Sequence, residues 1–287
     1  MLLTQLQKFY IVDAMNVLLV FIVGACVGSF LNVCICRIPA GKSVIFPRSR
    51  CGCGEPIPFW LNIPILSWLF LRGKARCCGR SISPRYLVVE LLTACLFTAL
   101  FLTYPFIPNF VIGCVFCSIL TVVSFIDIDT MEISDALSIG GMVVGVVLST
   151  IFPSWYSAQI SSDTVLDHLD ALVYSIVGVA SGSGLMFWIA ILGEMAFKKE
   201  AVGFGDIKLM GMIGSFIRWN GCLFAIFGGC LICGIIALPI LIFLKVFKGK
   251  DFKMSGEIPF APFIVVGSVA YVLYGQDLIA FVCGTGY

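Results

Sequence analysis

The chain has 287 residues, of which 60% are hydrophobic and only 12% are charged, and its mean hydropathy is +1.07. Soluble domains carry about 25% charged residues, so this composition excludes an ordinary soluble globular protein. The net charge of +2 says little about partners, and we expect no nucleic acid among them.

Eight apolar runs are predicted to cross a membrane. A crossing helix needs about 20 apolar residues, and lipid requires every backbone polar group to find an internal partner, which favours helices over strands. The sixth run is the shortest, with 13 residues. We therefore predict an all-α polytopic membrane protein with about eight transmembrane helices. They lie near residues 14–36, 87–104, 110–126, 136–152, 171–192, 207–219, 222–244 and 260–283.

The basic residues are distributed unevenly along the chain. Nine of the 18 lie from Arg37 to Arg85, where Glu55 is the single acid. The positive-inside rule places this segment in the cytoplasm. Counting crossings from there puts the loop at 153–170, which has three acids and neither Lys nor Arg, outside. It puts three further segments in the cytoplasm, at 127–135, 193–206 and 245–259.

One polar segment is long enough to form a small domain. It is rich in Pro and Gly, which favours loops and turns, and it contains the apolar stretch PILSWLFL. That stretch either docks on the membrane surface or forms a short buried helix. We predict three parts: a first transmembrane helix (1–36), a cytoplasmic basic cysteine-containing loop domain (37–86) and a seven-helix membrane domain, expected to be catalytic (87–287).

Four of the 14 cysteines lie in the predicted loop domain: Cys51, Cys53, Cys77 and Cys78. Two pairs of thiols about 25 residues apart resemble a zinc staple, because tetrahedral zinc takes four thiolates from two turns of chain. A disulfide is disfavoured in a reducing cytoplasm. The pairs read CGC and CC, whereas zinc knuckles place two residues between their thiols. Zinc and reduced thiols therefore both stay open.

Two acids are predicted at the same depth, at the cytoplasmic edge of the membrane. Asp127 follows the apolar run of the third span, and Asp206 follows the sequence GFG at the start of the sixth. An ionisable side chain in a membrane is costly and marks a candidate functional site. Asp206 alone is typical of a helix cap. As a pair, the carboxylates can share a proton, so that one activates water and the other polarises a peptide carbonyl.

Few other catalytic groups are available. The single histidine, His168, falls in the predicted outer loop without a serine or cysteine partner, and we expect it to be a solvated surface residue. Serine–histidine and histidine–metal mechanisms are therefore disfavoured. Two other classes stay open. One is a proton-coupled membrane transporter, whose acids would lie near the bilayer midplane; the other is a structural assembly factor that docks through the cysteine loop.

The chain resembles the type IV prepilin peptidases, which are bifunctional leader peptidases and N-methyltransferases. Its stretch GFGDIKLM (203–210) has the GxGDxKL pattern of intramembrane aspartyl proteases. The stretches occur in family order along nearly the whole chain: VGSFLNVCICRIP (27–39), LNIPILSWLFLRGK (61–74), ISPRYLVVELL (82–92), FIDIDTMEISD (125–135) and GFGDIKLM (203–210).

This resemblance implies an aspartic endopeptidase of the bacterial inner membrane with Asp127 and Asp206 as its catalytic residues. Such enzymes cleave the leader of prepilins or type II secretion pseudopilins at the cytoplasmic face. They then methylate the new N-terminus with S-adenosylmethionine. The lipid bilayer and the precursor peptides are the expected partners.

Further roles follow from the resemblance for residues around these motifs. Asn32 and Arg37 are candidates for binding substrate or the methyl donor, and Gly203 and Gly205 would let a substrate backbone approach. Lys208 would tune Asp206 or contact substrate, or it anchors the helix in the membrane interface.

The cysteines depart from the family pattern of two CxxC pairs. Cys53 and Cys78 align with that pattern, whereas Cys51 and Cys77 are each displaced by one residue. Zn2+ is therefore an implied but open ligand of the four cysteines.

Overall fold

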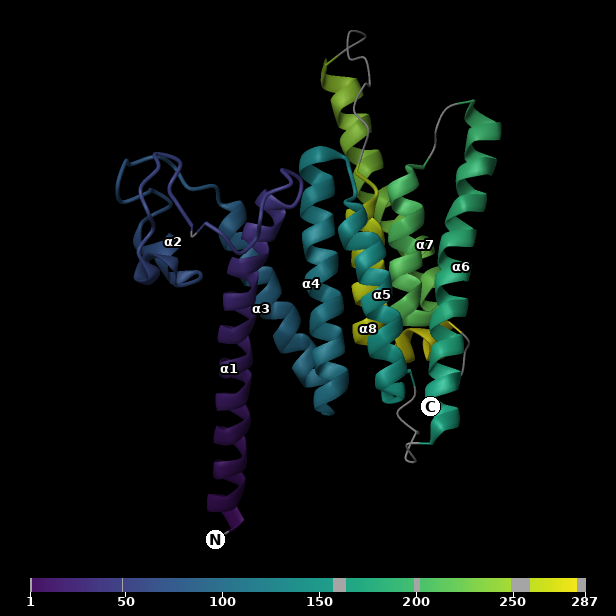
Figure 1. The fold of residues 1–287 in the computed structure, drawn as a ribbon, viewed down its shortest axis with the longest axis horizontal. Helices are drawn as coiled ribbons and strands as arrows, with labels where there is room; N and C mark the ends of the chain where they lie inside the picture. The colour runs from purple at the N-terminus through teal and green to yellow at the C-terminus, as the bar shows by residue number, and fades with distance from the viewer. Residues whose placement is uncertain (1, 48, 157–163, 199–201, 249–258, 283–287) are drawn as a thin grey trace. The chain divides into compact units, whose positions relative to one another are not determined.

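The computed structural model describes residues 2–47, 49–156, 164–198, 202–248 and 259–282 (Figure 1). Within these ranges every regular element is a helix, and two isolated β-bridges are the sole extended pairings. The helices are α1 (Leu2–Arg37), α2 (Leu66–Phe70), α3 (Arg85–Thr103), α4 (Ile107–Thr130), α5 (Asp135–Ile151), α6 (Val165–Phe197), α7 (Phe204–Lys248) and α8 (Ala261–Val282). Two short 3-10 helices are η1 (Phe59–Asn62) and η2 (Pro153–Trp155).

The predicted all-α polytopic membrane fold is confirmed. Each predicted span coincides with a helix, and five helices in the described residues are long and apolar enough to cross a membrane. α5 and the described apolar part of α8 are shorter. α7, with 45 residues, covers both the sixth and the seventh predicted spans.

α7 is two helices joined at a sharp break. Arg218 has φ 62° and ψ −178°, which no α-helix accommodates. The Sγ atom of Cys222 lies 3.0 Å from the position that a Cβ on Gly214 would occupy, whereas eight residues of continuous helix span about 12 Å. The chain therefore folds back after Ile217, so the sixth and seventh predicted spans are separate helices.

The chain forms two compact units, Met1–Val122 and Val123–Tyr287. In the first, α1 packs closely on α3 because two glycines one turn apart leave room for the partner backbone. A Cβ on Gly24 would lie 2.8 Å from the Ala94 Cα, and one on Gly28 would lie 2.7 Å from the Glu90 Cα. This is the small-residue packing by which membrane helices associate.

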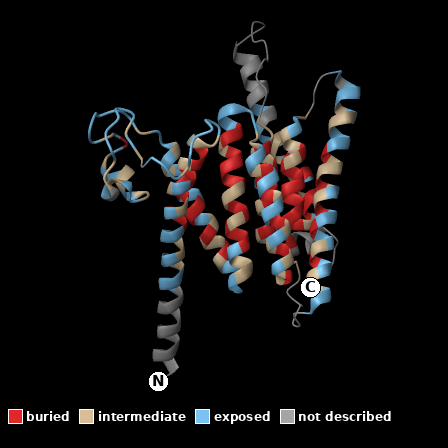
Figure 2. Ribbon diagram, in the orientation of Figure 1, coloured by how far each residue is buried: buried red, intermediate tan, exposed pale blue. Residues whose placement is uncertain are grey.

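In the second unit, α5, α6 and α8 all pack against α7 (Figure 1). α5 and α6 contact its first half, whereas α8 contacts Ala225 and Gly229 in its second half. The buried residues of this unit concentrate on α7, as the red segments of Figure 2 show. Gly178 of α6 faces the backbone of Gly214, and Gly182 faces that of Met210, so close that neither position has room for a Cβ. α6 and α7 therefore associate through small residues, as α1 and α3 do.

The predicted loop domain lies within the first unit and contains two tight turns. The bridges Arg50↔Pro56 and Lys74↔Ser81 each close one turn around a cysteine pair. Gly54 and Gly79 adopt positive φ angles of 97° and 69°, which glycine reaches without steric cost. These turns bring the cysteines of both pairs to the inside of two facing loops.

Candidate active site

Asp127 lies in the last turn of α4, where the residue is 6% exposed. The backbone N–H of Ala261, the first residue of α8, donates a hydrogen bond to it. The start of a helix carries unpaired N–H groups and a partial positive charge, which favours an anion. Within the described residues, the Oδ2 atom of Asp127 has no hydrogen-bond partner. The carboxylate is therefore held by one donor and keeps one oxygen for a reactant.

Asp206 lies in the first turn of α7 and is partly buried. The backbone N–H of Gly203 donates to its carboxylate, which is the return half of a capping box. The side chain therefore supports the start of the helix from its third residue, with Gly203 rather than Asp206 in the N-cap position. It also interacts electrostatically with Asp127, so the second unit brings the two predicted acids into one site.

The two glycines before Asp206 differ in their surroundings. A Cβ on Gly205 would lie 2.9 Å from the Cβ of Ile133, in the segment between α4 and α5. A Cβ on Gly203 would meet nothing closer than the Asp206 carboxylate, at 3.8 Å. The backbone of Gly203 is open and that of Gly205 is covered by Ile133, so open access at both positions, as predicted, holds only for Gly203.

Lys208 is ion-paired in the second unit. Its Nζ atom donates to Oδ1 of Asp135, the first residue of α5, over 2.6 Å. The side chain thus joins the beginning of α7 to the beginning of α5. Sequence analysis did not identify Asp135 as its partner, because the two residues are 73 positions apart.

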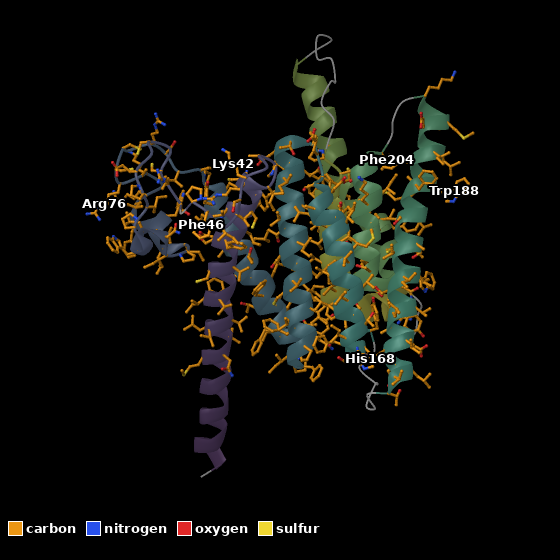
Figure 3. All side chains as sticks on the ribbon, in the orientation of Figure 1. Lys42, Phe46, Arg76, His168, Trp188 and Phe204 are labelled. Carbon is orange, nitrogen blue, oxygen red and sulfur yellow. The ribbon has the colours of Figure 1, made fainter. Side chains whose placement is uncertain are left out.

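His168 lies on α6 rather than in a loop. Its Nδ1 atom is 2.7 Å from the carbonyl oxygen of Thr150, and the residue is half buried, so the expected loop position was wrong and the side chain is only partly exposed to its surroundings. Figure 3 shows His168 and Phe204, the first residue of α7, at opposite ends of the second unit. The histidine therefore lies away from the two acids.

The four loop cysteines form one cluster in the first unit. All four sulfur atoms lie within 4.8 Å of one another, with 3.6 Å between Cys51 and Cys78 and 3.4 Å between Cys53 and Cys77. Tetrahedral zinc with bonds of about 2.3 Å separates its sulfur ligands by about 3.8 Å. The cluster therefore fits a zinc ion despite its unusual spacing, because each turn contributes both of its thiols.

The thiols of the cluster have strongly divergent acidities. The backbone N–H of Cys53 and hydrogen bonds from neighbouring thiols lower the pKa of Cys51 to about 7. Hydrogen bonds to the Cys51 and Cys53 sulfurs raise the pKa of Cys77 to about 12. Negative charge therefore accumulates among the sulfurs as they ionise, and a bound cation would neutralise it.

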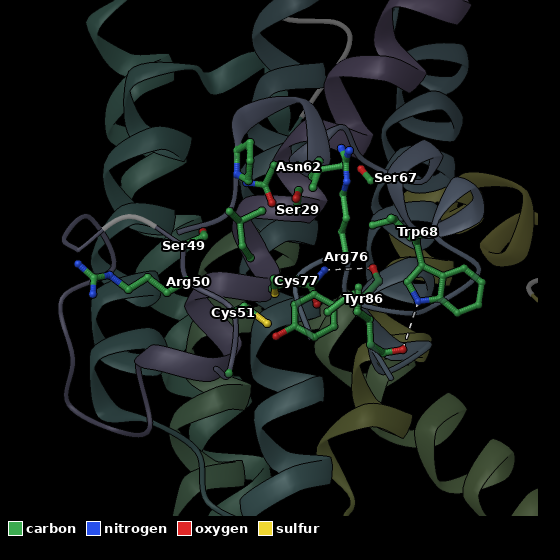
Figure 4. Close-up of a pocket in the computed structure, with 18 of the residues that line it drawn as sticks. Ser29, Ser49, Arg50, Cys51, Asn62, Ser67, Trp68, Arg76, Cys77 and Tyr86 are labelled. Carbon is green, nitrogen blue, oxygen red and sulfur yellow. Dashed lines mark hydrogen bonds between the residues drawn. The ribbon is translucent and has the colours of Figure 1, made fainter. Parts of the chain in front are cut away.

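A pocket of about 830 Å³ lies beside the cluster, between the loop domain and the ends of α1 and α3 (Figure 4). Asn32 and Arg37, the candidates for binding substrate or the methyl donor, both line it. The Nδ2 atom of Asn32 donates to the carbonyl oxygen of Tyr86, and the guanidinium of Arg37 donates to those of Ser43 and Pro47. Both side chains shape the walls of the pocket.

The aromatic lining of this pocket was not predicted. Trp60, Trp68 and Tyr86 contribute to its walls, and Glu90 lies at its inner end. Apart from Glu90, which is an acid near the start of a span, these residues gave no signal. Aromatic side chains in an apolar stretch are indistinguishable from core or membrane-facing residues until the loop folds.

Two family models match the chain. The Bacterial Peptidase A24 N-terminal domain covers residues 22–104, which include the cysteine cluster. The Type IV leader peptidase family covers residues 114–238, which include Asp127 and Asp206. No solved structure matches the chain.

Curated relatives carry a single kind of name. The chain is 38% identical over 204 residues to the "Prepilin leader peptidase/N-methyltransferase" of Myxococcus xanthus, a match that covers 71% of this chain and 56% of that protein. Matches to proteins of the same name from Klebsiella pneumoniae (35% identical) and Bacillus subtilis (32%) cover 84% and 96% of their lengths and 70% and 92% of this chain. The chain thus spans about half of the first relative and most of the other two.

The helices, the paired acids and these matches define a multi-pass membrane peptidase of the bacterial inner membrane. Within this class, the chain belongs to the type IV leader peptidase family. The transporter alternative finds no support in these matches.

Proposed function

We propose that the chain is an aspartic endopeptidase that removes the leader peptide of type IV prepilins or pseudopilins. The pairing of Asp127 with Asp206 carries this proposal. Asp127 is buried, and its Oδ2 atom has no hydrogen-bond partner among the described residues. Asp206 is partly buried and close enough to Asp127 for the two charges to interact. Relatives named prepilin leader peptidase/N-methyltransferase support the choice of substrate.

The proposed reaction is hydrolysis of one peptide bond. The ionised carboxylate takes a proton from water, whose oxygen attacks the peptide carbonyl, while the protonated carboxylate donates a hydrogen bond to the carbonyl oxygen. Collapse of the tetrahedral intermediate breaks the C–N bond, and the leaving amine takes up a proton. The N–H of Ala261 fixes Asp127, and the N–H of Gly203 fixes Asp206, so neither carboxylate has to reorganise.

Leader cleavage by purified variants tests this assignment. Asp127→Ala and Asp206→Ala should each reduce the cleavage rate of a prepilin by at least about a hundredfold, in the range for loss of a general acid or base. Glu132→Gln, an exposed acid on the adjoining segment, is the matched control and should cleave at the rate of the parent chain. Cleavage at the parent rate by either aspartate variant would contradict the dyad.

We further propose that the 830 Å³ pocket holds S-adenosylmethionine and the new N-terminus of the pilin. When bound, S-adenosylmethionine supplies an electrophilic methyl group on a sulfonium. The aromatic faces of Trp68 and Tyr86 suit a sulfonium cation, and the Glu90 carboxylate suits hydroxyl or amine donors. The N-methyltransferase names of the relatives support this assignment.

The cysteine cluster is proposed to bind Zn2+ as a structural staple. Cys51, Cys53, Cys77 and Cys78 would hold the ion and fix the two turns of a loop that has little core of its own. The pocket wall contains Cys51 and Cys77, so the staple would also set the shape of the pocket. The excess of basic residues supports a cytoplasmic position for this domain and for the active site.

A further inference from the structure

The loop domain has an apolar face on the segment formed by η1 and α2. Its members are each about half exposed or more, and they occur at nearly every third position, with residues 63–65 between the two short helices themselves not helical. Leu61, Trp68 and Leu71 line the pocket, and Trp60 and Ile63, at the edge of the face, border it as well. The η1–α2 face consists of Trp60 (53% exposed), Ile63 (47%), Leu66 (50%), Leu69 (53%) and Phe70 (84%).

A hydrogen bond ties this segment to a position inside a membrane span. The backbone N–H of Ile65, directly before α2, donates to Oε2 of Glu90 over 2.6 Å. Glu90 lies five residues into α3, about 7.5 Å along the helix axis from Arg85. α2 therefore begins beside the spanning helix, below its first residue, rather than beyond its end.

The pocket beside α2 also extends along the first spanning helix. Ser67 of α2 lines one pocket together with Ser29 of α1 (Figure 4). Ser29 is eight residues, or about 12 Å, before the end of α1 at Arg37. The loop domain is joined to membrane-spanning helices at both of its ends, so it cannot move away from the surface.

The charges around the face are those of a segment that meets anionic lipid. Arg72, Lys74, Arg76 and Arg80 follow α2 closely and are all exposed, and no acid lies between Glu55 and Glu90. Figure 3 shows Arg76 at the outer edge of the loop domain. Long basic side chains reach headgroup phosphates while their stems stay in the apolar layer, and each contributes to binding at an anionic surface.

We propose that the η1–α2 face is a membrane-docking surface that lies among the headgroups and upper acyl chains of the anionic leaflet. Interfacial helices bury Trp, Phe and Leu about 5–10 Å deep with basic residues on the opposite side, which matches the depth set by Glu90. The pocket beside the same segment is thereby fixed at the level where an apolar peptide leaves the membrane. A peptide partner for the face is the competing occupant.

Tryptophan quenching in vesicles tests the proposal with a matched pair on one segment. The full chain has five tryptophans. Two variants retain Trp60 or Trp68 alone, with the other four changed to Phe. Each is reconstituted in phosphatidylethanolamine–phosphatidylglycerol vesicles that contain phosphatidylcholine brominated at carbons 6 and 7. If a multiple variant folds poorly, Trp60→Phe is made in the parent chain instead. The difference in lipid quenching between the parent chain and this variant then gives the quenching of Trp60.

Trp60 should be quenched by the brominated lipid at least about twofold more than Trp68, and aqueous acrylamide should quench Trp60 little. Equal lipid quenching of both tryptophans, or strong acrylamide quenching of Trp60, would overturn the proposal. Strong acrylamide quenching of Trp60 that a prepilin N-terminal peptide relieves would show a peptide-docking face and would also overturn it. Leader cleavage by Asp127 and Asp206 does not depend on either outcome.

Discussion

Gly203 and Gly205 look equivalent in the sequence GFGD, yet they face different neighbours. Gly203 offers its N–H to Asp206 and stays open, whereas Gly205 is in contact with Ile133. The second glycine therefore lets the segment between α4 and α5 approach the start of α7. This contact helps to set the distance between Asp127 and Asp206.

Adding a methyl group at Gly205 should move the two acids apart. Gly205→Ala places a Cβ 2.9 Å from that of Ile133, and overpacking of this kind costs about 1–3 kcal/mol. We expect a roughly tenfold loss of leader cleavage, largely restored by adding Ile133→Ala. Gly140→Ala, at a position with nothing within 4 Å, is the control. A double variant as slow as the single one would show that Ile133 is not the cause.

The sulfur cluster gives a pH-dependent prediction. Metal binding requires thiolates, and the pKa of Cys51 is about 7 while that of Cys77 is about 12. At pH 8 Cys51 is already ionised, whereas at pH 6 zinc must displace its proton. Cys77 must give up its proton at both pH values. The apparent zinc affinity should therefore fall by about tenfold per pH unit for each proton displaced as pH decreases.

Competition with a chromophoric zinc chelator at pH 6 and pH 8 measures this dependence on the purified full chain. Cys77→Ser should bind zinc more weakly, and Cys95→Ser, at an exposed site on α3, should not. A chain that binds zinc equally at both pH values, or retains its affinity without Cys77, would not use this cluster.

At the scale of elements, the start of α7 is connected to α5 by a charge pair. Lys208 and Asp135 are 33% and 62% exposed, and such exposed pairs contribute about 0–1 kcal/mol. The pair therefore acts by orienting the first turn of α7, which contains Asp206, rather than by stabilising the whole protein.

Exchange of the two charges separates positioning from substrate contact. Lys208→Asp and Asp135→Lys should each lower the kcat of leader cleavage several-fold, and the double exchange should recover most of it. Lys208→Asp combined with Glu132→Lys, which places a lysine at a different site, should not recover. If the double exchange stays as slow as Lys208→Asp, then Lys208 acts on substrate and not through Asp135.

The break in α7 explains how so short a helix is tolerated in lipid. The first half runs from Phe204 to Ile217, about 21 Å, less than the hydrocarbon thickness of about 30 Å. Its last carbonyls would lack partners, but the Ser215 oxygen accepts from three hydroxyl groups and the Phe216 oxygen accepts from an indole N–H. The donors are Ser149, Ser175, Tyr156 and Trp155.

At the scale of the whole molecule, hydropathy and charge were sufficient to predict the membrane-spanning helices. The 13-residue sixth span was predicted correctly because the polar residues around Arg218 interrupt the apolar run. Asp127 and Asp206 were paired because both follow apolar or glycine-rich sequence at one predicted depth. Long-range contacts were not predictable: the Ala261 N–H, Ile133 and Asp135 reach the site through packing that leaves no local pattern.

In the cysteine loop, the local sequence pattern argued against a site that the folded chain does form. Ligand spacing argued against four sulfurs at one point, but positive φ at Gly54 and Gly79 curls each turn so that adjacent thiols face inward. The pocket likewise needs the folded loop, because its aromatic lining comes from a stretch that reads as a membrane segment.

The two units are expected to carry two separable reactions, with hydrolysis at Asp127 and Asp206 and methyl transfer in the pocket of the first unit. The most direct test uses Asp206→Asn with two substrates, an intact prepilin and a pilin peptide that already has the mature N-terminus. Mass spectrometry follows loss of the leader and gain of a methyl group. We predict no detectable cleavage of the prepilin and parent-like methylation of the mature peptide. Cleavage of the prepilin at the parent rate would contradict the account.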